Sequence, residues 1–238
     1  MADPRSLTSV VLVTGTGTEV GKTVVTAALA AVVRERGSDV GVVKPAQTGL
    51  APGEPGDVDE VRRLVGDEVV THELVRLRDP LSPEAAARRE GVRLPPVAQH
   101  AKRIGEIAAE SEVVLVEGAG GLLVRLDERG GTLADLGTGL RYKGVGCGVV
   151  LVVSAGLGTL NTAALTAEAL AARSLPLLGV VIGSWPDDPG LAEESNLVDL
   201  PRVTGAPLWG RIPAGAGALT REAFLEGVHD WFSLDDEG

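Results

Sequence analysis

Apolar runs and helical patterns alternate along the chain. Runs rich in Val, Leu and Ile predict buried strands at residues 10–15, 39–45, 112–121, 148–159, 176–185 and 206–213. Segments with apolar residues at helical spacing predict helices at residues 21–37, 57–66, 82–91, 95–111, 161–174 and about 220–233. Because strands and helices take turns and no linker divides the pattern, we expect one α/β domain over residues 1–238. Its sheet should be parallel, with right-handed crossovers and helices on both faces.

Two segments do not follow this alternation. Residues 47–57 read QTGLAPGEPGD, where glycine and proline favour turns and predict a flexible loop. Residues 137–148 read GTGLRYKGVGCG and are expected to form an expanded loop, to which we assign no function.

Composition and charge narrow the class of protein. Hydrophobic residues make up 44% of the 238 residues and aromatic residues only 3%, which is typical of an aliphatic core around a parallel sheet. The formal net charge of −11 argues against a surface that binds nucleic acid or anionic lipid. The single cysteine, Cys147, excludes a disulfide framework and a thiolate zinc site, and we expect it to be buried. Neither a signal region nor a bilayer-spanning run is found, so we expect a cytoplasmic protein without membrane or nucleic-acid partners.

The residues with candidate chemistry follow the predicted strands. Ligands of open parallel sheets bind beyond the carboxyl ends of the strands. Glycines, charged residues and hydroxyl residues gather at these positions, namely residues 15–22, 44–48, 117–121, 155–159, 183–185 and 212–215. The sequence therefore predicts a ligand site along this edge of the sheet.

The stretch TGTGTEVGKT at residues 14–23 predicts a phosphate-binding loop between a strand and a helix. Backbone N–H groups of such a loop and the helix N-terminus attract anions. Lys22 would supply a full positive charge, and the hydroxyl of Thr23 could ligate Mg²⁺. The spacing from Gly15 to the Gly-Lys pair is one residue longer than the common motif, and an ordinary glycine turn is the alternative interpretation.

Other polar residues at the strand ends fit phosphoryl transfer. Glu117 ends a predicted strand and would face the phosphate loop if its strand neighbours the first one. Either Asp57 or Asp59, at the start of a predicted helix, could reach the same metal ion, although a helix N-cap is an alternative role for Asp57. Lys44 could neutralise charge that develops during transfer, or it could be a surface lysine.

Five motifs together resemble the dethiobiotin synthetase family. They occur in order along about residues 10–215 and read TGTGTEVGKT at 14–23, KPAQTG at 44–49, VEGAGGLLV at 116–124, AGLGTLN at 155–161 and VIGSWP at 181–186. The resemblance implies a fold like that of the P-loop NTPases and a ligase that uses ATP and Mg²⁺.

The resemblance also implies a reaction. The substrate 7,8-diaminopelargonic acid takes up CO₂ as a carbamate on one amine. The carbamate oxygen attacks the γ-phosphate of ATP and forms a mixed anhydride. The second amine then displaces phosphate and closes the ureido ring of dethiobiotin. Positioning and charge neutralisation supply the catalysis, and no protein nucleophile is needed.

The motif match implies roles for individual residues. The nucleotide phosphates would be wrapped by Glu19, Val20, Gly21, Lys22, Thr23 and Val24 and approached by the backbone of Glu117, Gly118, Ala119 and Gly120. Mg²⁺ would be held by Thr23, Asp57 and Glu117. The groups that act on the transferred phosphate and the carbamate would be Lys44, Lys22 and Thr18, and Thr48 would contact the substrate.

Family members are homodimers in which a helix N-terminus of the neighbouring subunit binds the remote carboxylate of the substrate. In this chain the resemblance implies that Gly158, Thr159, Leu160 and Asn161 supply that site. A plain helix cap made by Thr159 is the alternative. Well-known members also carry an asparagine after the fifth strand that reads the adenine edge, whereas this chain has Gly183 and Ser184 there. Pro213, Ala214 and Gly215 would flank the base, so we expect relaxed selectivity among nucleoside triphosphates.

Two other classes of protein share a phosphate loop of this kind. A synthetase with a glutaminase domain would need a nucleophilic cysteine and more chain than is present. A nucleotide switch that positions a septum or partitions DNA would need a basic patch or tail, and the C-terminal residues DWFSLDDEG are acidic. The switch is the main alternative to the ligase.

Overall fold

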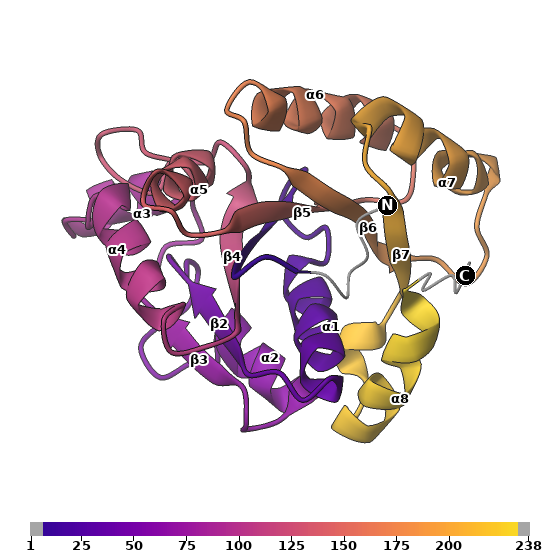
Figure 1. Cartoon of the computed structure of the whole chain (residues 1–238), viewed down its shortest axis with the longest axis horizontal. Helices are drawn as coiled ribbons and strands as arrows, with labels where there is room; N and C mark the ends of the chain where they lie inside the picture. The colour runs from indigo at the N-terminus through magenta and orange to yellow at the C-terminus, as the bar shows by residue number, and fades with distance from the viewer. Residues whose placement is uncertain (1–6, 233–238) are drawn as a thin grey trace.

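The computed structural model describes residues 7–232, which form seven strands and eight α-helices around one sheet (Figure 1). The strands are β1 (Val10–Gly15), β2 (Val40–Lys44), β3 (Val70–Glu73), β4 (Val113–Gly121), β5 (Cys147–Val153), β6 (Leu177–Trp185) and β7 (Leu208–Pro213). Their order in the sheet is β3-β2-β4-β1-β5-β6-β7, and every neighbouring pair is parallel. The predicted parallel α/β fold is confirmed.

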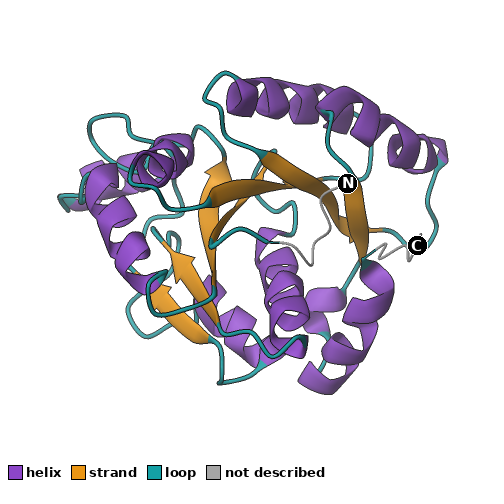
Figure 2. Cartoon of the chain, viewed as in Figure 1, coloured by secondary structure: helices purple, strands orange, loops and turns teal. Residues whose placement is uncertain are grey.

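Each connection between successive strands contains at least one helix, and one helix follows the last strand. The helices are α1 (Lys22–Glu35), α2 (Asp57–Val65), α3 (Pro83–Glu90), α4 (Val97–Ile107), α5 (Leu133–Tyr142), α6 (Thr159–Ala171), α7 (Leu191–Thr204) and α8 (Arg221–Trp231), with a short 3₁₀ turn at Ala216–Ala218. Figure 2 shows that the helices surround the strands on both sides.

The core has one layer on each face of the sheet because successive residues of a strand point to opposite faces. Val11 and Val13 of β1 pack with α1, α2 and α8, whereas Val10 and Leu12 pack with α4 and α5. A third cluster joins α6 and α7 to β5 and β6. Val, Leu, Ile and Ala supply most of these buried side chains, as the composition predicts.

Cys147 is fully buried at the start of β5, and burial raises the pKa of its thiol to about 12. A thiol in this setting is not ionised at neutral pH, so it behaves as a small apolar side chain.

Three elements were missed or misassigned by the sequence patterns. The expectation of an expanded loop at 137–148 is wrong, because α5 covers residues 133–142 and β5 begins at Cys147. The loop was expected because of the glycines in this segment, including Gly137. Gly137 lies in the helix, where an added Cβ would come within 2.7 Å of the Leu12 side chain, so a glycine allows α5 to approach β1 closely. Strand β3 and helix α7 were not predicted at all.

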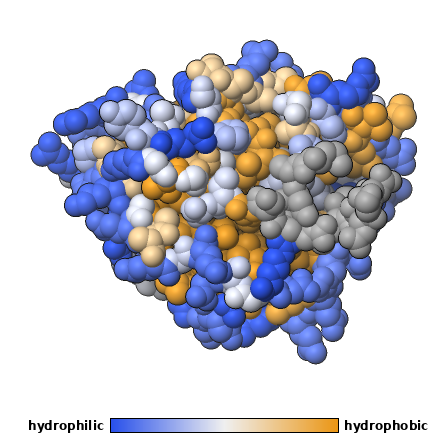
Figure 3. Space-filling view, viewed as in Figure 1, coloured by the Kyte–Doolittle hydropathy of each residue, from blue (hydrophilic) through white to orange (hydrophobic). Residues whose placement is uncertain are grey.

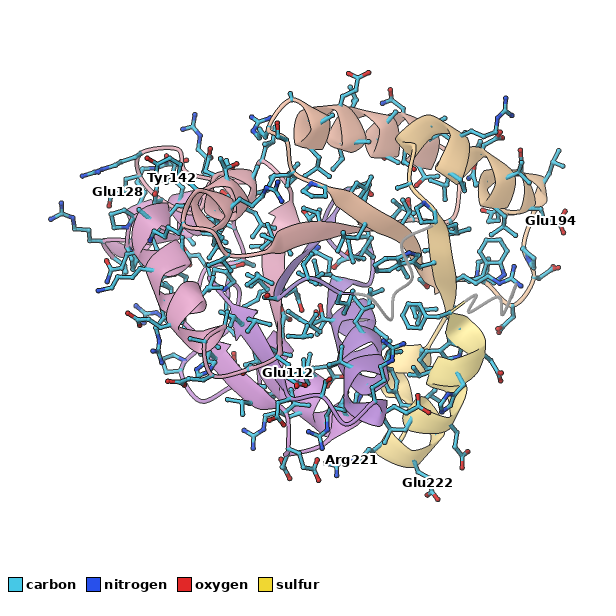
Figure 4. All side chains as sticks on the ribbon, in the orientation of Figure 1. Glu112, Glu128, Tyr142, Glu194, Arg221 and Glu222 are labelled. Atoms are coloured by element: carbon cyan, nitrogen blue, oxygen red, sulfur yellow. The ribbon has the colours of Figure 1, made fainter. Side chains whose placement is uncertain are left out.

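Charged side chains dominate the outer surface in the common view. Figure 4 shows Glu128, Glu194 and Glu222 at the periphery, together with Tyr142 at the end of α5. In Figure 3 the rim of this face is largely hydrophilic and hydrophobic residues gather toward its middle. Within residues 7–232, no helix has both the length and the apolar character needed to cross a membrane.

Candidate active site

The phosphate loop lies at the carboxyl end of β1, which is flanked by β4 on one side and β5 on the other. β1 therefore ends between two other strand ends, the position at which open α/β sheets bind ligands. Val13 of β1 pairs with Glu117 of β4, which confirms that the strand of Glu117 neighbours the first strand. On the other side the N–H of Thr16 donates to the carbonyl of Val152 in β5, at 3.0 Å.

The loop has an unusual backbone. Glu19 and Gly21 adopt φ values of 58° and 91°, in the left-handed region that favours glycine. A Cβ on Gly21 would clash with the carbonyl of Gly183, and a Cβ on Gly183 would clash with the carbonyl of Val20. The end of β6 therefore packs directly against the phosphate loop, and positions 21 and 183 both require glycine.

Lys22 begins α1 and is largely buried beside the loop. Its Nζ donates to the carbonyl of Gly17 at 2.8 Å. Burial lowers the pKa of Lys22, although the nearby Glu117 carboxylate opposes this. A phosphate group in the loop would supply the missing counter-charge.

Three charged side chains and the hydroxyl of Thr23 form a cluster beside the phosphate loop at the end of the sheet. The Nζ of Lys44 donates to Oε1 of Glu117 at 2.8 Å and forms an ion pair with Asp57. The hydroxyl of Thr23 donates to the same Oε1 of Glu117 at 3.0 Å. The structure thus brings together four residues from β2, β4, α1 and α2, and Lys44 is not a surface lysine because it is 4% exposed.

The electrostatics of this group keep Lys44 charged. Burial opposes the ammonium ion, but Glu117 and Asp57 outweigh burial and raise the pKa of Lys44. Burial also disfavours the carboxylate of Asp57, yet Lys44 holds the pKa of Asp57 below its ordinary value. Burial, with the Asp57 charge added, raises the pKa of Glu117.

A cleft of about 530 Å³ unites most of the predicted site residues. It is lined by Thr18, Glu19, Gly21, Lys22, Thr23, Val24, Lys44, Ala46, Gln47, Thr48, Asp57, Glu117, Ala119 and Gly120. Val20 and Gly118 are not among the lining residues. The carbonyl of Gly118 accepts from Lys44 Nζ at 3.3 Å.

The two candidate aspartates have different surroundings. Asp57 is the first residue of α2 and contacts Lys44, whereas Asp59 accepts from the N–H of Gly56 at 2.8 Å and closes the helix N-terminus. Gly56 is the N-cap residue, so the alternative interpretation of Asp57 as an N-cap is wrong. The geometry favours Asp57 for a role in the cleft.

The predicted base-binding residues lie at the ends of β6 and β7. Ser184, Pro213, Ala214 and Gly215 are exposed and are not part of the cleft lining, and Gly183 is buried under the phosphate loop. The N–H of Ala214 donates to the carbonyl of Trp185 at 2.7 Å. That amide is therefore occupied and does not offer a donor to a base.

The segment Gly158 to Asn161 is not brought into the cleft. It forms the N-terminus of α6, where Gly158 is the N-cap residue with φ of 89°. Thr159 is the first helical residue, and its buried hydroxyl has no hydrogen-bond partner among the described residues, so it does not cap the helix as the alternative interpretation required. Gly158 and Asn161 are exposed.

Two supporting residues were not recognised from the sequence. Gln47 lies in the motif KPAQTG and lines the cleft, but nothing in its residue type marks it out. Asn196 is buried on α7, and its Nδ2 donates to the carbonyls of Ala155 and Gly156 at 2.6 and 3.2 Å. It fixes the turn before α6, and it was missed because α7 was not predicted.

The residues present fit a hard cation. Two carboxylates, those of Asp57 and Glu117, pair with the ammonium group of Lys44, and the hydroxyl of Thr23 donates to Glu117, so this point of the cleft attracts positive charge. Oxygen ligands of this kind suit Mg²⁺, which usually takes one or two protein carboxylates and completes its octahedron with phosphates and water.

Comparison with known proteins identifies the family. A family model described as an AAA domain matches residues 9–219. A protein of Streptomyces avermitilis named ATP-dependent dethiobiotin synthetase BioD is 55% identical over 94% of this chain and 92% of its own length. Proteins of the same name from Parafrankia sp. and Frankia casuarinae are 56% and 57% identical, over 92% and 90% of this chain and 89% and 87% of their own. The chain belongs to the ATP-dependent dethiobiotin synthetase family.

Solved structures add information on the fold. The cell division ATPase MinD of Pyrococcus furiosus matches with a TM-score of 0.54 and 20% identity, over 100% of this chain and 93% of that one. The signal recognition particle 54 kDa protein of Aeropyrum pernix matches with a TM-score of 0.56 and 20% identity, over 96% of this chain and 50% of that one. At this identity the likeness shows the P-loop NTPase-like fold alone, whereas sequence identity places the chain among the dethiobiotin synthetases.

Proposed function

We propose that this protein forms dethiobiotin from 7,8-diaminopelargonic acid, CO₂ and ATP. The observation that carries the proposal is the single cleft in which the phosphate loop faces Lys44, Asp57 and Glu117. This arrangement suits a reaction in which a nucleotide phosphate and a second anion must meet. Identity of 55–57% to proteins named as dethiobiotin synthetases supports the substrate assignment.

The nucleotide phosphates bind along the loop from Glu19 to Val24 in this proposal. Backbone N–H groups and the start of α1 hold the phosphates, and Lys22 moves from the carbonyl of Gly17 to the β- and γ-oxygens. Thr18 and the backbone of Gly120 border the place where the γ-phosphate would lie, because both line the cleft beside the loop.

Lys44 pairs with Asp57 and Glu117 and lines the cleft, so in this proposal its ammonium faces both the carbamate and the γ-phosphate. The carbamate oxygen forms the new P–O bond and ADP leaves. The free amine then attacks the carbamate carbon, phosphate leaves, and the ring closes with loss of the amine proton. Lys44 stabilises the negative charge that develops on the transferred group, and no covalent enzyme intermediate forms.

Thr23, Asp57 and Glu117 would hold Mg²⁺, which when bound would neutralise phosphate charge and align the γ-phosphate. The chain's own contribution is the geometry of these oxygens, set by α1, α2 and β4. Thr48, which also lines the cleft, would contact the carbamate or the diamine.

The substrate's remote carboxylate would bind to a second copy of this chain. Gly158 to Asn161 lie outside the cleft of their own subunit, yet the exposed start of α6 suits an anion. Exposed apolar side chains accompany this helix terminus, including Leu157 at 91% and Leu165 at 58%. They support a homodimer that completes each active site with the partner's helix.

We also propose relaxed selectivity for the nucleotide base. Gly183 and Ser184, rather than an asparagine, stand at the end of β6, Gly183 is buried under the loop, and the amide of Ala214 is occupied. ATP, GTP, CTP and UTP are therefore expected to give product at rates that differ less than they would with a base-reading amide.

The test is a coupled assay for nucleoside diphosphate, with dethiobiotin identified by mass. Release of diphosphate should require both the diamine and bicarbonate, and the product should gain one carbon from labelled bicarbonate. A septum-positioning or partition switch, the second candidate, would hydrolyse ATP without the diamine and respond to DNA or lipid. Hydrolysis unaffected by the diamine would refute the ligase. The expected cytoplasmic location stays a prediction that cell fractionation can test.

A further inference from the structure

Gln47 has both ends of its side-chain amide committed to residues with expected functions. Its Oε1 accepts from the N–H of Asp57 at 3.0 Å, and its Nε2 donates to the carbonyl of Thr48 at 3.2 Å. The side chain is buried, with 5% of the residue exposed, at the wall of the cleft. A single amide group thus connects the expected substrate contact to the expected metal ligand.

The backbone of Gln47 is itself rigidly held. Its N–H donates to the carbonyl of Val75 at 2.8 Å, and its carbonyl accepts from the N–H of Leu77 at 2.9 Å. These bonds extend the parallel pairing of β2 and β3 beyond the end of the sheet. The sheet therefore fixes the backbone from which the Gln47 side chain extends, whereas Asp57 follows an exposed loop.

Arg76 restrains that loop from the outside. Its guanidinium forms a two-point pair with Glu73, at 2.6 and 2.8 Å, and its Nη1 donates to the carbonyls of Ala51 and Glu54 at 3.1 and 2.5 Å. Residues 51–55 are exposed, so few apolar contacts order them. The loop that joins Thr48 to Asp57 is held at its middle by Arg76 and at both ends by Gln47.

The fold does not need Gln47 to retain α2. Val58, Val61, Leu64 and Val65 bury the apolar side of that helix in the core. Loss of the Gln47 amide would release the first turn of the helix while the rest stays packed. This loss would change the direction of the Asp57 carboxylate and the position of Thr48 in the cleft wall. It would lower the free energy of unfolding only slightly.

We propose that Gln47 is a positioning residue that fixes the Asp57 carboxylate and Thr48 relative to each other. Arg76 holds the loop between them. The inference rests on the proposed function, which assigns Asp57 as a metal ligand and Thr48 as a substrate contact. It predicts that the metal end and the substrate end of the cleft lose affinity together when this one amide is removed.

The test compares Gln47→Met with Gln99→Met, a matched change at an exposed glutamine of α4. ADP affinity is measured by calorimetry with and without Mg²⁺, and the diamine KM is measured in the coupled assay. In Gln47→Met the gain in ADP affinity from Mg²⁺ should fall about tenfold and the diamine KM should rise several-fold, as loss of one buried hydrogen bond allows. ADP affinity without Mg²⁺ and the melting temperature should match Gln99→Met.

Gln47→Glu provides the rescue, because it retains the acceptor for the Asp57 amide and loses the donor to Thr48. It should restore the Mg²⁺ effect while the diamine KM stays raised. Equal Mg²⁺ effects in Gln47→Met and wild type would overturn the inference, and so would a parallel loss of Mg²⁺-free ADP affinity and melting temperature, which indicates a structural role only.

Arg76→Met keeps the inference testable if Gln47→Met does not fold. Amide hydrogen exchange in residues 51–57 should then be faster than in wild type, and the Mg²⁺ effect should weaken in the same direction. Unchanged exchange and an unchanged Mg²⁺ effect would overturn the clamp. A wild-type protein that binds Mg-ADP but makes no dethiobiotin would refute the proposed function, whereas the Mg²⁺ effect in Gln47→Met would still test the positioning of Asp57.

Discussion

Charge on single buried residues sets the character of the cleft. Lys44 keeps its ammonium ion because two carboxylates outweigh the cost of burial, whereas burial of Lys22 outweighs the nearby carboxylates and lowers its pKa. The first lysine is therefore held ready between acids, and the second is poised to accept phosphate oxygens. Their different surroundings therefore suit the two lysines to different roles in the same cleft.

Lys22→Ala and Lys44→Ala should each reduce turnover by about 10²-fold or more, because charge stabilisation in the transition state is usually the largest catalytic contribution. The coupled diphosphate assay measures the effect, and circular dichroism checks that the fold persists. Lys102→Ala, at an exposed lysine of α4, is the control and should retain wild-type turnover. A normal rate for either active-site variant would refute its assigned role.

Asp127 illustrates how one carboxylate stabilises a loop. It accepts from the N–H groups of Val97, Arg129 and Gly131 at 2.7, 2.9 and 2.8 Å. Burial opposes its charge, but these backbone donors hold the pKa of Asp127 below its ordinary value. The carboxylate thus joins the loop after β4 to the start of α4.

Asp127→Asn should lower the free energy of unfolding at pH 7 by about 2 kcal/mol, since hydrogen bonds to a charged group are worth about 1.5–3 kcal/mol each and some are retained. A depressed pKa stabilises the folded state above the unfolded pKa of about 3.9, and that stability is lost as pH falls through the folded value. The difference between variant and wild type in urea melts should therefore shrink in acid. A difference that is constant with pH would contradict this account.

At the scale of elements, the contact between β6 and the phosphate loop decides the shape of the site. Gly183 and Gly21 meet backbone to backbone, so a strand and a loop distant in sequence form one wall. The same closeness explains why position 183, near the end of β6, is a glycine. Packing under the loop requires it, whatever residue reads the base.

Gly183→Ala should destabilise the protein by about 1–3 kcal/mol and weaken ADP binding, because a Cβ there overlaps the carbonyl of Val20. Gly105→Ala is the matched control in α4, where an added Cβ meets nothing within 4 Å. That change should stabilise the helix by roughly 0.5–1 kcal/mol. Thermal melts and ADP calorimetry measure both, and a neutral Gly183→Ala would show that the loop can move away.

At the scale of the whole molecule, apolar side chains on α6 and α7 and just before α6 are left uncovered by the other residues that the structure describes. Leu157, Leu165, Leu191 and Val198 are exposed, with Leu191 at 85%. Surface of this kind indicates an interface when it adjoins an exposed helix terminus. The proposed second copy would cover it and bring Gly158 to Asn161 toward the other cleft.

Leu165→Glu should therefore shift the protein from dimer to monomer and raise the diamine KM by at least about tenfold, because a buried charge without a partner costs several kcal/mol at an interface. Light scattering measures the mass and the coupled assay measures KM. Leu81→Glu, at an exposed leucine before α3, should change neither. A wild-type monomer that retains full activity would exclude the shared site.

The sequence alone determined the alternation of strands and helices, the phosphate loop and the family, because these depend on local pattern and on residues close in the chain. Elements with weak local patterns escaped it. β3 has only four residues at a sheet edge, and α7 contains Pro201 in its interior. Helix α5 contains glycines, which are typical of loops, and Gly137 among them allows close packing against Leu12 of β1. Only the tertiary structure decided that Asp57, rather than Asp59, meets Lys44, because the direction of that carboxylate depends on how distant strands anchor an otherwise exposed loop.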